Sequence, residues 1–267
     1  MDLNRFIEQG IGSIATALSN FYISECESTD FLMSLVPSLA LSTEIRQKHE
    51  ERGHHIPPFL IASIASKCNL HCAGCYARAG GICAENQGEK EMSVDDWKKV
   101  LAEASELGIS FVLLAGGEPL LRRDIISMAA DFPNMIFPIF TNGTLMDEAY
   151  IELFNKRRNL IPFFSIEGDA KETDLRRGEG VSKNVGNAME KLHTQRVLFA
   201  ASVTVTNRNL KAVVSEGFLK DLRSKGCGAV FFVEYVPAEK GTEGLVLSED
   251  EAGRLNTAVR FLKAQFT

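Results

Sequence analysis

The chain has 267 residues, of which 45% are hydrophobic and 24% charged, and its formal net charge is −6. This length allows one large domain, or a domain with an appendage, and a substantial buried core. The acidic balance and the lack of a basic tract interleaved with aromatic residues argue against a nucleic-acid partner. We expect the short basic clusters at Arg122-Arg123 and 156–158 to be solvated helix faces.

Neither the first residues nor the most apolar run predicts a membrane partner. Residues 1–4 lack the basic start of a secretory signal. The run 31–41 is too short to span a bilayer and contains Pro37. The cysteines are clustered rather than spread as pairs, which suits a metal site in a reducing compartment better than disulfides. We therefore predict a cytoplasmic location and no membrane partner.

Three segments are expected along the chain. Residues 1–57 carry helical periodicity without an alternating strand pattern, and they end in a stiff connection at Pro57, which predicts an N-terminal helical extension. Residues 58–240 are expected to form the core domain. Residues 241–267 are expected to form a C-terminal helix that packs on this core.

From residue 59 onward, apolar strand-like segments and amphipathic helical segments alternate six times. This alternation predicts a parallel sheet covered by helices, with chemistry at the carboxyl ends of the strands. Six units are too few for a closed eight-fold barrel, whereas a doubly wound open sheet has the same pattern and remains an alternative. The expected strands are 59–65, 111–115, 135–140, 162–166, 200–206 and 230–236.

Helix starts are predicted from polar residues that cap the first turn. Two of them have an acidic residue three positions later, which is the capping-box spacing. One helix is expected to run from about residue 210 to Gly226. The predicted starts are Ser93 with Asp96, Asp147, Ser182, and Ser248 with Glu251.

The strongest motif directly follows the first predicted strand and has the spacing Cys68-x3-Cys72-x2-Cys75. Three thiolates cannot close a four-ligand site, whereas a four-iron cluster held by three of them keeps one iron open to a small molecule. A zinc knot with His71 or Cys83 as the fourth ligand remains an alternative. So does a ferredoxin-like cluster that uses Cys83.

Polar and glycine-rich turns close the next three strands at the same edge of the predicted sheet. Two consecutive glycines let backbone groups approach a ligand without obstruction by a Cβ atom. Ser165 and Glu167 are two residues apart on a strand and would point to one face, where burying both calls for a polar ligand. The turns are Gly116-Gly117-Glu118-Pro119, Thr141-Asn142-Gly143 and Ser165-Ile166-Glu167-Gly168.

Over roughly residues 58–240 the chain resembles the radical S-adenosylmethionine (radical SAM) superfamily. The resemblance rests on the cysteine triplet with aromatic Tyr76 directly after it, and on the Gly-Gly-Glu-Pro turn of the second strand. It implies a partial (β/α)6 barrel, in agreement with the six units counted above. It also implies that Cys68, Cys72 and Cys75 hold a [4Fe–4S] cluster whose fourth iron takes S-adenosylmethionine. Reductive cleavage would then give a 5′-deoxyadenosyl radical that removes hydrogen from an organic substrate.

The same resemblance implies cofactor contacts at the strand ends. Residues 174–178 look like the His-Asp-x-x-Arg-Gly loop of the family, with Thr173 in the place of the histidine. Relatives more often have Asp at the position of Glu167. The implied contacts are Gly116, Gly117 and Glu118 with the methionyl amino group, Ser165 and Glu167 with the carboxylate and ribose, Arg177 with the carboxylate, Tyr76 along the adenine, and Thr141 and Asn142 at the end of the third strand.

The details after the fourth strand resemble the branch with peptide and protein maturases of the SPASM type, although no cysteine-rich extension follows Cys227. We therefore predict modification of a peptide or protein side chain, with a reducing partner such as flavodoxin or ferredoxin. The enzymatic alternative is a step in small-molecule or cofactor biosynthesis. The alternative from a different class is a non-catalytic iron–sulfur or zinc protein.

Overall fold

The computed structural model describes residues 16, 21, 30–83 and 91–266. Helix α2 (Asp30–Glu50) occupies most of the described part of the predicted N-terminal extension. The remainder of 1–29 lies outside the described residues, apart from residues 16 and 21. The boundaries expected for the three segments of the chain stay predictions.

Six parallel strands form a single sheet in the order β1-β2-β3-β4-β5-β6, so neighbours in the sequence are also neighbours in space. A doubly wound sheet would reverse its strand order at a switch point, and this sheet does not. The fold is therefore a partial (β/α)6 barrel, as predicted. The strands are β1 (Phe59–Ala65), β2 (Phe111–Gly116), β3 (Phe137–Thr141), β4 (Leu160–Ile166), β5 (Ala200–Val205) and β6 (Ala229–Glu234).

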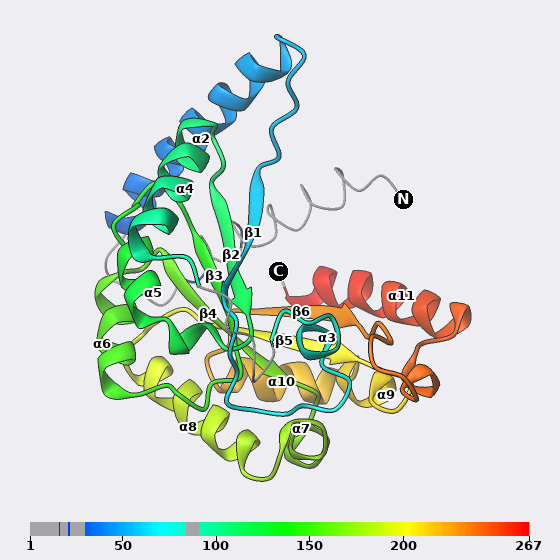
Figure 1. The fold of residues 1–267 in the computed structure, drawn as a ribbon. Coiled ribbons are helices and arrows are strands. Elements are labelled where there is room, and N and C mark those ends of the chain that lie inside the picture. Colours follow the sequence, from blue (N-terminus) through cyan, green and yellow to red (C-terminus); the bar gives the residue numbers. More distant parts are fainter. Residues whose placement is uncertain (1–15, 17–20, 22–29, 84–90, 267) are drawn as a thin grey trace.

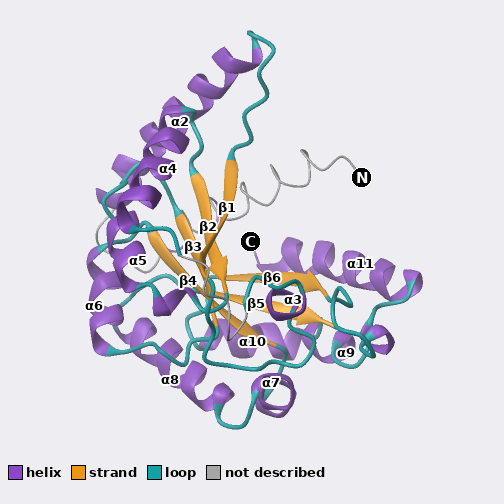
Figure 2. Cartoon of the chain, viewed as in Figure 1, coloured by secondary structure: helices purple, strands orange, loops and turns teal. Residues whose placement is uncertain are grey.

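Helices follow the strands and lie along the outer side of the twisted sheet (Figure 1). Figure 2 shows the strands fanning from upright β1 and β2 to nearly horizontal β5 and β6, with the loops of their carboxyl ends converging near α3. None of the described helices combines the length and apolar character needed to cross a membrane. They are α3 (Tyr76–Ala79), α4 (Val94–Glu106), α5 (Arg123–Ala129), α6 (Glu148–Lys156), α7 (Ala170–Arg177), α8 (Val181–Thr194), α9 (Leu210–Val213), α10 (Glu216–Ser224) and α11 (Glu249–Phe266), with 3-10 turns η1 (Pro119–Leu121) and η2 (Glu243–Leu245).

Local capping confirms most of the predicted helix starts. Ser93 forms the expected capping box at α4, and the Asp147 side chain accepts from the backbone of the first turn of α6. The prediction for α8 was wrong, because this helix begins at Val181 rather than after Ser182. The carboxylate of Asp174 in α7 accepts from the backbone N–H of Ser182 at 2.7 Å and thus supplies the cap from a neighbouring helix.

The helix predicted from residue 210 to Gly226 is also divided in two. Ser215 interrupts it, with extended backbone and a side chain that accepts from Phe218 N, and so begins α10 as a new N-cap. Ser and similar residues favour caps over helix interiors, because their side chains compete for backbone groups. The predicted end was right, since Gly226 has φ +85°.

The two faces of the sheet pack into two separate hydrophobic clusters. The outer face packs against the helices, while the inner face carries a layer of phenylalanines joined by Leu35 of α2. The ring centroids of Phe140 and Phe163 lie 5.0 Å apart, and those of Phe163 and Phe231 lie 5.8 Å apart. Most of this apolar layer lies towards the beginnings of the strands, whereas the polar residues of the predicted motifs lie at their carboxyl ends.

Candidate functional site

The three clustered cysteines lie on one loop between β1 and α3. All three side chains are partly buried and none forms a disulfide. Burial raises the pKa of the Cys68 thiol to about 11. Burial also raises the pKa of Cys72, while the charges of Arg177 and Arg176 act in the opposite direction. Desolvation thus disfavours the thiolate at Cys68 and Cys72, and a metal ligand must be a thiolate.

The beginning of the cysteine loop is tied to the segment before α4. The Glu91 carboxylate accepts from Ser66 N at 2.9 Å and from Ser66 Oγ at 2.6 Å, and these bonds lower its pKa. Arg122 donates to the carbonyl of Ile64 at 3.1 Å. The expectation that Arg122 lies on a solvated face was wrong, since its side chain is only 12% exposed and holds the end of β1.

The two glycines after β2 allow the second loop to approach the first. A Cβ atom on Gly116 would lie 2.4 Å from Ala65 O, and one on Gly117 would lie 2.1 Å from Lys67 O. In the structure their small size therefore accommodates the backbone that leads into the cysteine loop. Gly117 N and Glu118 N donate to these same carbonyls, at 2.7 Å and 2.8 Å. The Gly-Gly turn and the cysteine loop form one hydrogen-bonded unit.

Glu118 is almost completely buried and connects the ends of β2 and β3. Its carboxylate accepts from Leu120 N at 3.0 Å, from Thr141 Oγ1 at 2.6 Å and from Asn142 N at 2.8 Å. Burial raises the pKa of this carboxyl, while the three hydrogen bonds act to lower it. In this conformation the side chain of Glu118 is directed to the protein itself.

Asn142 connects the end of β3 to the first cysteine. Its amide nitrogen donates to Asn69 Oδ1 at 2.9 Å and approaches Cys68 Sγ at 3.9 Å. Its carbonyl oxygen accepts from Thr144 N at 2.9 Å, which fixes which way the amide points. Hydrogen bonds to a metal-ligating sulfur orient it and tune the metal that it holds.

Glu167 lies directly after β4 and is held by two arginines of α7. Arg177 donates to both of its carboxylate oxygens, with Nε–Oε2 at 2.8 Å and Nη2–Oε1 at 2.7 Å. Arg176 donates to Oε1 and also to Thr204 Oγ1 of β5. Ser165 is partly buried and pairs in register with Ser202 of β5. The structure thus brings Ser165, Glu167 and Arg177 to the same edge, with Glu167 and Arg177 paired to each other.

The backbone between Cys72 and Cys75 is held from two distant parts of the chain. Ala73 N donates to Arg176 O at 2.9 Å, and Arg176 Nε donates back to Ala73 O at 3.2 Å. Gly74 N donates to a carboxylate oxygen of Glu239 at 2.7 Å. Sequence reasoning gave no role to these two residues, because Arg176 fills an unspecified position of the loop at 174–178 and Glu239 lies in no motif.

Tyr235 lies against the same backbone, directly after β6. A Cβ atom on Gly74 would lie 2.1 Å from its hydroxyl oxygen, so only glycine fits there. This hydroxyl is buried and has no hydrogen-bond partner within the described part of the chain. A buried donor without a partner is uncommon in proteins and points to a group that completes the site.

The thiols of the cysteine loop are also compared with the geometry of known kinds of metal site. Among the described residues, no three His, Cys, Asp or Glu side chains are gathered closely enough to hold one ion. The thiolates of a four-iron cluster stand farther apart, because irons and sulfides lie between them. Cys83 is buried, and its proximity to Cys68 contributes, after burial, to raising the pKa of Cys68.

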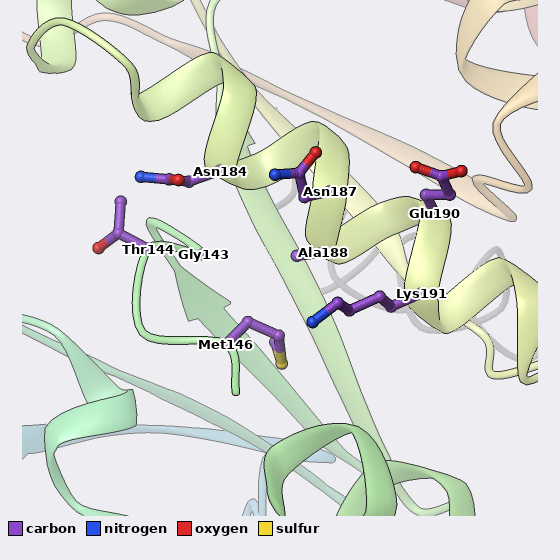
Figure 3. A pocket seen from close by; sticks show the side chains of 8 residues that line it. All are labelled: Gly143, Thr144, Met146, Asn184, Asn187, Ala188, Glu190 and Lys191. Atoms are coloured by element: carbon purple, nitrogen blue, oxygen red, sulfur yellow. The ribbon is translucent and has the colours of Figure 1, made fainter. Parts of the chain in front are cut away.

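Tyr76 and a surface hollow beside the loop after β3 add to the description of this edge. The Tyr76 side chain begins α3 and is 59% exposed. A hollow of about 390 Å³ lies between the loop after β3 and helix α8 (Figure 3). Its polar side chains include Asn187 and Lys191, and no cysteine lines it. Thr144 lines this hollow and also bonds to Asn69 at 2.8 Å, next to Cys68.

Comparison with known proteins identifies the family of this arrangement. The model of the radical SAM superfamily matches residues 63–208. Fe-coproporphyrin III synthase of Methanosarcina barkeri is 25% identical over 199 residues, which cover 73% of this chain and 48% of that protein. PqqA peptide cyclase of Granulibacter bethesdensis is 28% identical over 153 residues, covering 56% of this chain and 39% of the relative. The chain thus spans less than half the length of these two relatives.

A solved structure shows the same fold. SuiB of Streptococcus suis, bound to its precursor peptide SuiA, aligns with a TM-score of 0.64 at 18% sequence identity. The alignment covers 84% of this chain and 50% of SuiB. At this identity the likeness concerns the arrangement of strands and helices.

Proposed function

Because this chain belongs to the radical SAM superfamily, we propose that it cleaves S-adenosylmethionine reductively at a [4Fe–4S] cluster and removes hydrogen from an organic substrate. Both cofactors are those of the family. When bound, they would supply a 5′-deoxyadenosyl radical. The observation that carries the proposal is the cysteine loop itself, whose three partly buried thiols follow the carboxyl end of β1 and form no disulfide.

In this proposal Cys68, Cys72 and Cys75 are the cluster ligands. Asn142 supports the role of Cys68, since its amide approaches that sulfur. The glycine turn supports it as well, because Gly117 and Glu118 bond to the backbone just before Cys68. Ligand loops that are fixed before the metal arrives need less reorganisation on binding.

The S-adenosylmethionine site would lie over the carboxyl ends of β2 to β5. We propose that the turn at 116–118 faces the methionyl amino group and that Ser165 and Glu167 take the carboxylate and ribose. Arg177 would serve the carboxylate, a task suited to a guanidinium fork. Its present pairing with Glu167 orients that fork. Thr141, Asn142 and Tyr76 complete the proposed rim.

For the substrate we propose a peptide or protein side chain. PqqA peptide cyclase and SuiB, which is bound to a precursor peptide, favour this class. Fe-coproporphyrin III synthase favours the second candidate, a step in cofactor biosynthesis. The proposal includes a reducing partner such as flavodoxin or ferredoxin and a cytoplasmic location, where such reductants and free thiols coexist.

The test is anaerobic reconstitution with iron and sulfide, followed by reduction in the presence of S-adenosylmethionine. We expect about four irons per chain, the brown absorbance of a cluster, and release of 5′-deoxyadenosine measured by mass spectrometry. Cys72→Ala should lose all three signals. The matched control is Cys227→Ala, since the Cys227 thiol donates to Ala229 O away from the loop. A colourless zinc protein, or an intact cluster without cleavage, would contradict the proposal.

The substrate class needs a separate test. Short peptides encoded beside this gene would be incubated with the reduced enzyme, and porphyrins and nucleotides in parallel. A mass change in a peptide that depends on S-adenosylmethionine supports the first candidate. Conversion of a small molecule alone would favour the second.

A further inference from the structure

We infer that Arg176 is a positioning residue for the metal centre: it fixes the backbone between two cluster ligands and places a positive charge beside them that raises the reduction potential of the cluster. This inference rests on the proposed function. Arg176 fills an unspecified position of the loop at 174–178, in which the neighbouring Arg177 was expected to act instead.

The first part of the argument is geometric. Arg176 and Ala73 are 103 positions apart, yet they exchange two hydrogen bonds, Ala73 N to Arg176 O at 2.9 Å and Arg176 Nε to Ala73 O at 3.2 Å. Ala73 directly follows Cys72 and is two residues before Cys75. A shift of this bond pair therefore moves two of the three thiols relative to each other.

The guanidinium of Arg176 is itself held from several sides. Its Nη1 donates to Glu167 Oε1 and to Thr204 Oγ1, at 2.5 Å and 3.1 Å. Its Cζ lies 5.8 Å from the ring centroid of Tyr235, the residue that packs on Gly74. The side chain is only 18% exposed. A lysine at this position could not reach all these acceptors at once, because its ammonium is a single point at the end of a flexible chain.

The second part of the argument is electrostatic. Two guanidinium groups surround one carboxylate, since Arg177 already forms a two-pronged pair with Glu167. Arg176 therefore adds a second positive charge beside this one carboxylate, and its Nε donates to the cysteine loop. The Glu239 carboxylate accepts from Gly74 N of the same loop, so Arg176→Gln removes one positive charge from a group of two arginines and two glutamates. The side chain of Arg176 is 18% exposed, that of Arg177 10% and that of Glu167 3%. Solvent therefore screens the charge of Arg176 weakly. A fixed positive charge favours the cluster state that has gained an electron.

The experiment compares reconstituted wild type with Arg176→Gln and Arg176→Lys. Arg157→Gln is the matched control, because that arginine pairs with Asp131 at the surface. Two readouts are taken without any substrate: the midpoint of a redox titration followed by electron paramagnetic resonance, and the iron retained after exposure to a chelator. The melting temperature of each metal-free variant checks that it folds.

The electrostatic role and the positioning role of Arg176 predict different results for the two variants. Arg176→Gln should shift the reduction equilibrium about tenfold towards the oxidised cluster, or about 59 mV for one electron. Arg176→Lys keeps the charge, so its potential should stay near that of wild type. Both variants should release iron at least several-fold faster, since both lose the Nε–H that donates to Ala73 O and keep only the backbone bond from Ala73 N to the carbonyl of residue 176. The control should match wild type in both readouts.

Each half of the inference can be overturned separately. An unchanged potential in Arg176→Gln, or an equal drop in Arg176→Lys, overturns the electrostatic role. Iron retention equal to wild type in both variants overturns the positioning role. If wild type itself assembles no four-iron cluster, the proposed function fails instead, and that outcome is seen before any variant is compared.

Discussion

Glu167 and Arg177 form a buried two-pronged ion pair, with Nε–Oε2 at 2.8 Å and Nη2–Oε1 at 2.7 Å and exposed side-chain fractions of 3% and 10%. Breaking such a pair leaves an uncompensated buried charge. We expect Glu167→Gln to lower the free energy of unfolding of the metal-free protein by ~3–5 kcal/mol. Denaturant unfolding followed by circular dichroism measures this change.

The control for that prediction is Glu152→Gln. Glu152 pairs with Lys156 on the surface of α6, where both side chains are about two-thirds exposed. Solvent screens an exposed pair of this kind, so we expect its loss to change the free energy of unfolding far less. If both substitutions lowered the free energy of unfolding equally, burial of the Glu167–Arg177 pair would not increase its contribution to stability.

Asn142 offers a test of how the first cysteine is held. Its amide approaches Cys68 Sγ at 3.9 Å and bonds to Asn69 at 2.9 Å. Losing a group that orients a metal ligand typically weakens metal binding ~10–100-fold. We expect Asn142→Ala to retain iron correspondingly less well in a chelator competition. Retention at the wild-type level would mean that Cys68 is placed by the backbone alone.

The glycine turn gives a prediction about stability. A Cβ atom on Gly117 would lie 2.1 Å from Lys67 O, and backbone cannot move away as a flexible side chain could. Gly117→Ala should therefore destabilise the fold by ~1–3 kcal/mol. Gly186→Ala is the control, since nothing lies within 4 Å of its Cβ position in α8. That change should stabilise the fold by ~0.5–1 kcal/mol. Thermal unfolding distinguishes opposite signs directly.

Asp147 gives a prediction about pH. Its hydrogen bonds, first of all that with Arg123, hold its pKa below the ordinary 3.8. A lowered pKa contributes stability above pH 3.8, which is lost as the pH falls through the folded-state value. Asp147→Asn should therefore be less stable than wild type by up to ~1 kcal/mol at pH 7, allowing for solvent screening. As the pH falls from 7, the difference in the free energy of unfolding between Asp147→Asn and wild type should shrink to zero. A constant difference would contradict the assignment.

The sequence predicted the elements of this fold well, because its signals are local. Six apolar strands, the capping box at Ser93 and the glycine at 226 each depend on a few neighbouring residues. The start of α8 was mispredicted, since its cap comes from Asp174 in the preceding helix. Motif spacing likewise placed the cysteines and the glycine turn at one edge.

What the sequence did not predict is how the site is held together. Arg176, Tyr235 and Glu239 contact the cysteine loop from 100 or more positions away, and no periodicity marks them. Glu118 was expected to face a ligand, yet its carboxylate bonds to Thr141 and the backbone nearby. Contacts of this kind form only once the strands are placed side by side, and the hydrophobic pattern along the sequence does not predict which distant residues then meet.

The hydrogen bond between Gly74 and Glu239 spans 165 positions and has a consequence for biogenesis. A nascent chain that has not yet emerged past Glu239 lacks one of the supports on which the thiols rest. Iron insertion is therefore expected late, after the last strand has docked. Until then the backbone between Cys72 and Cys75 lacks its bond to Glu239.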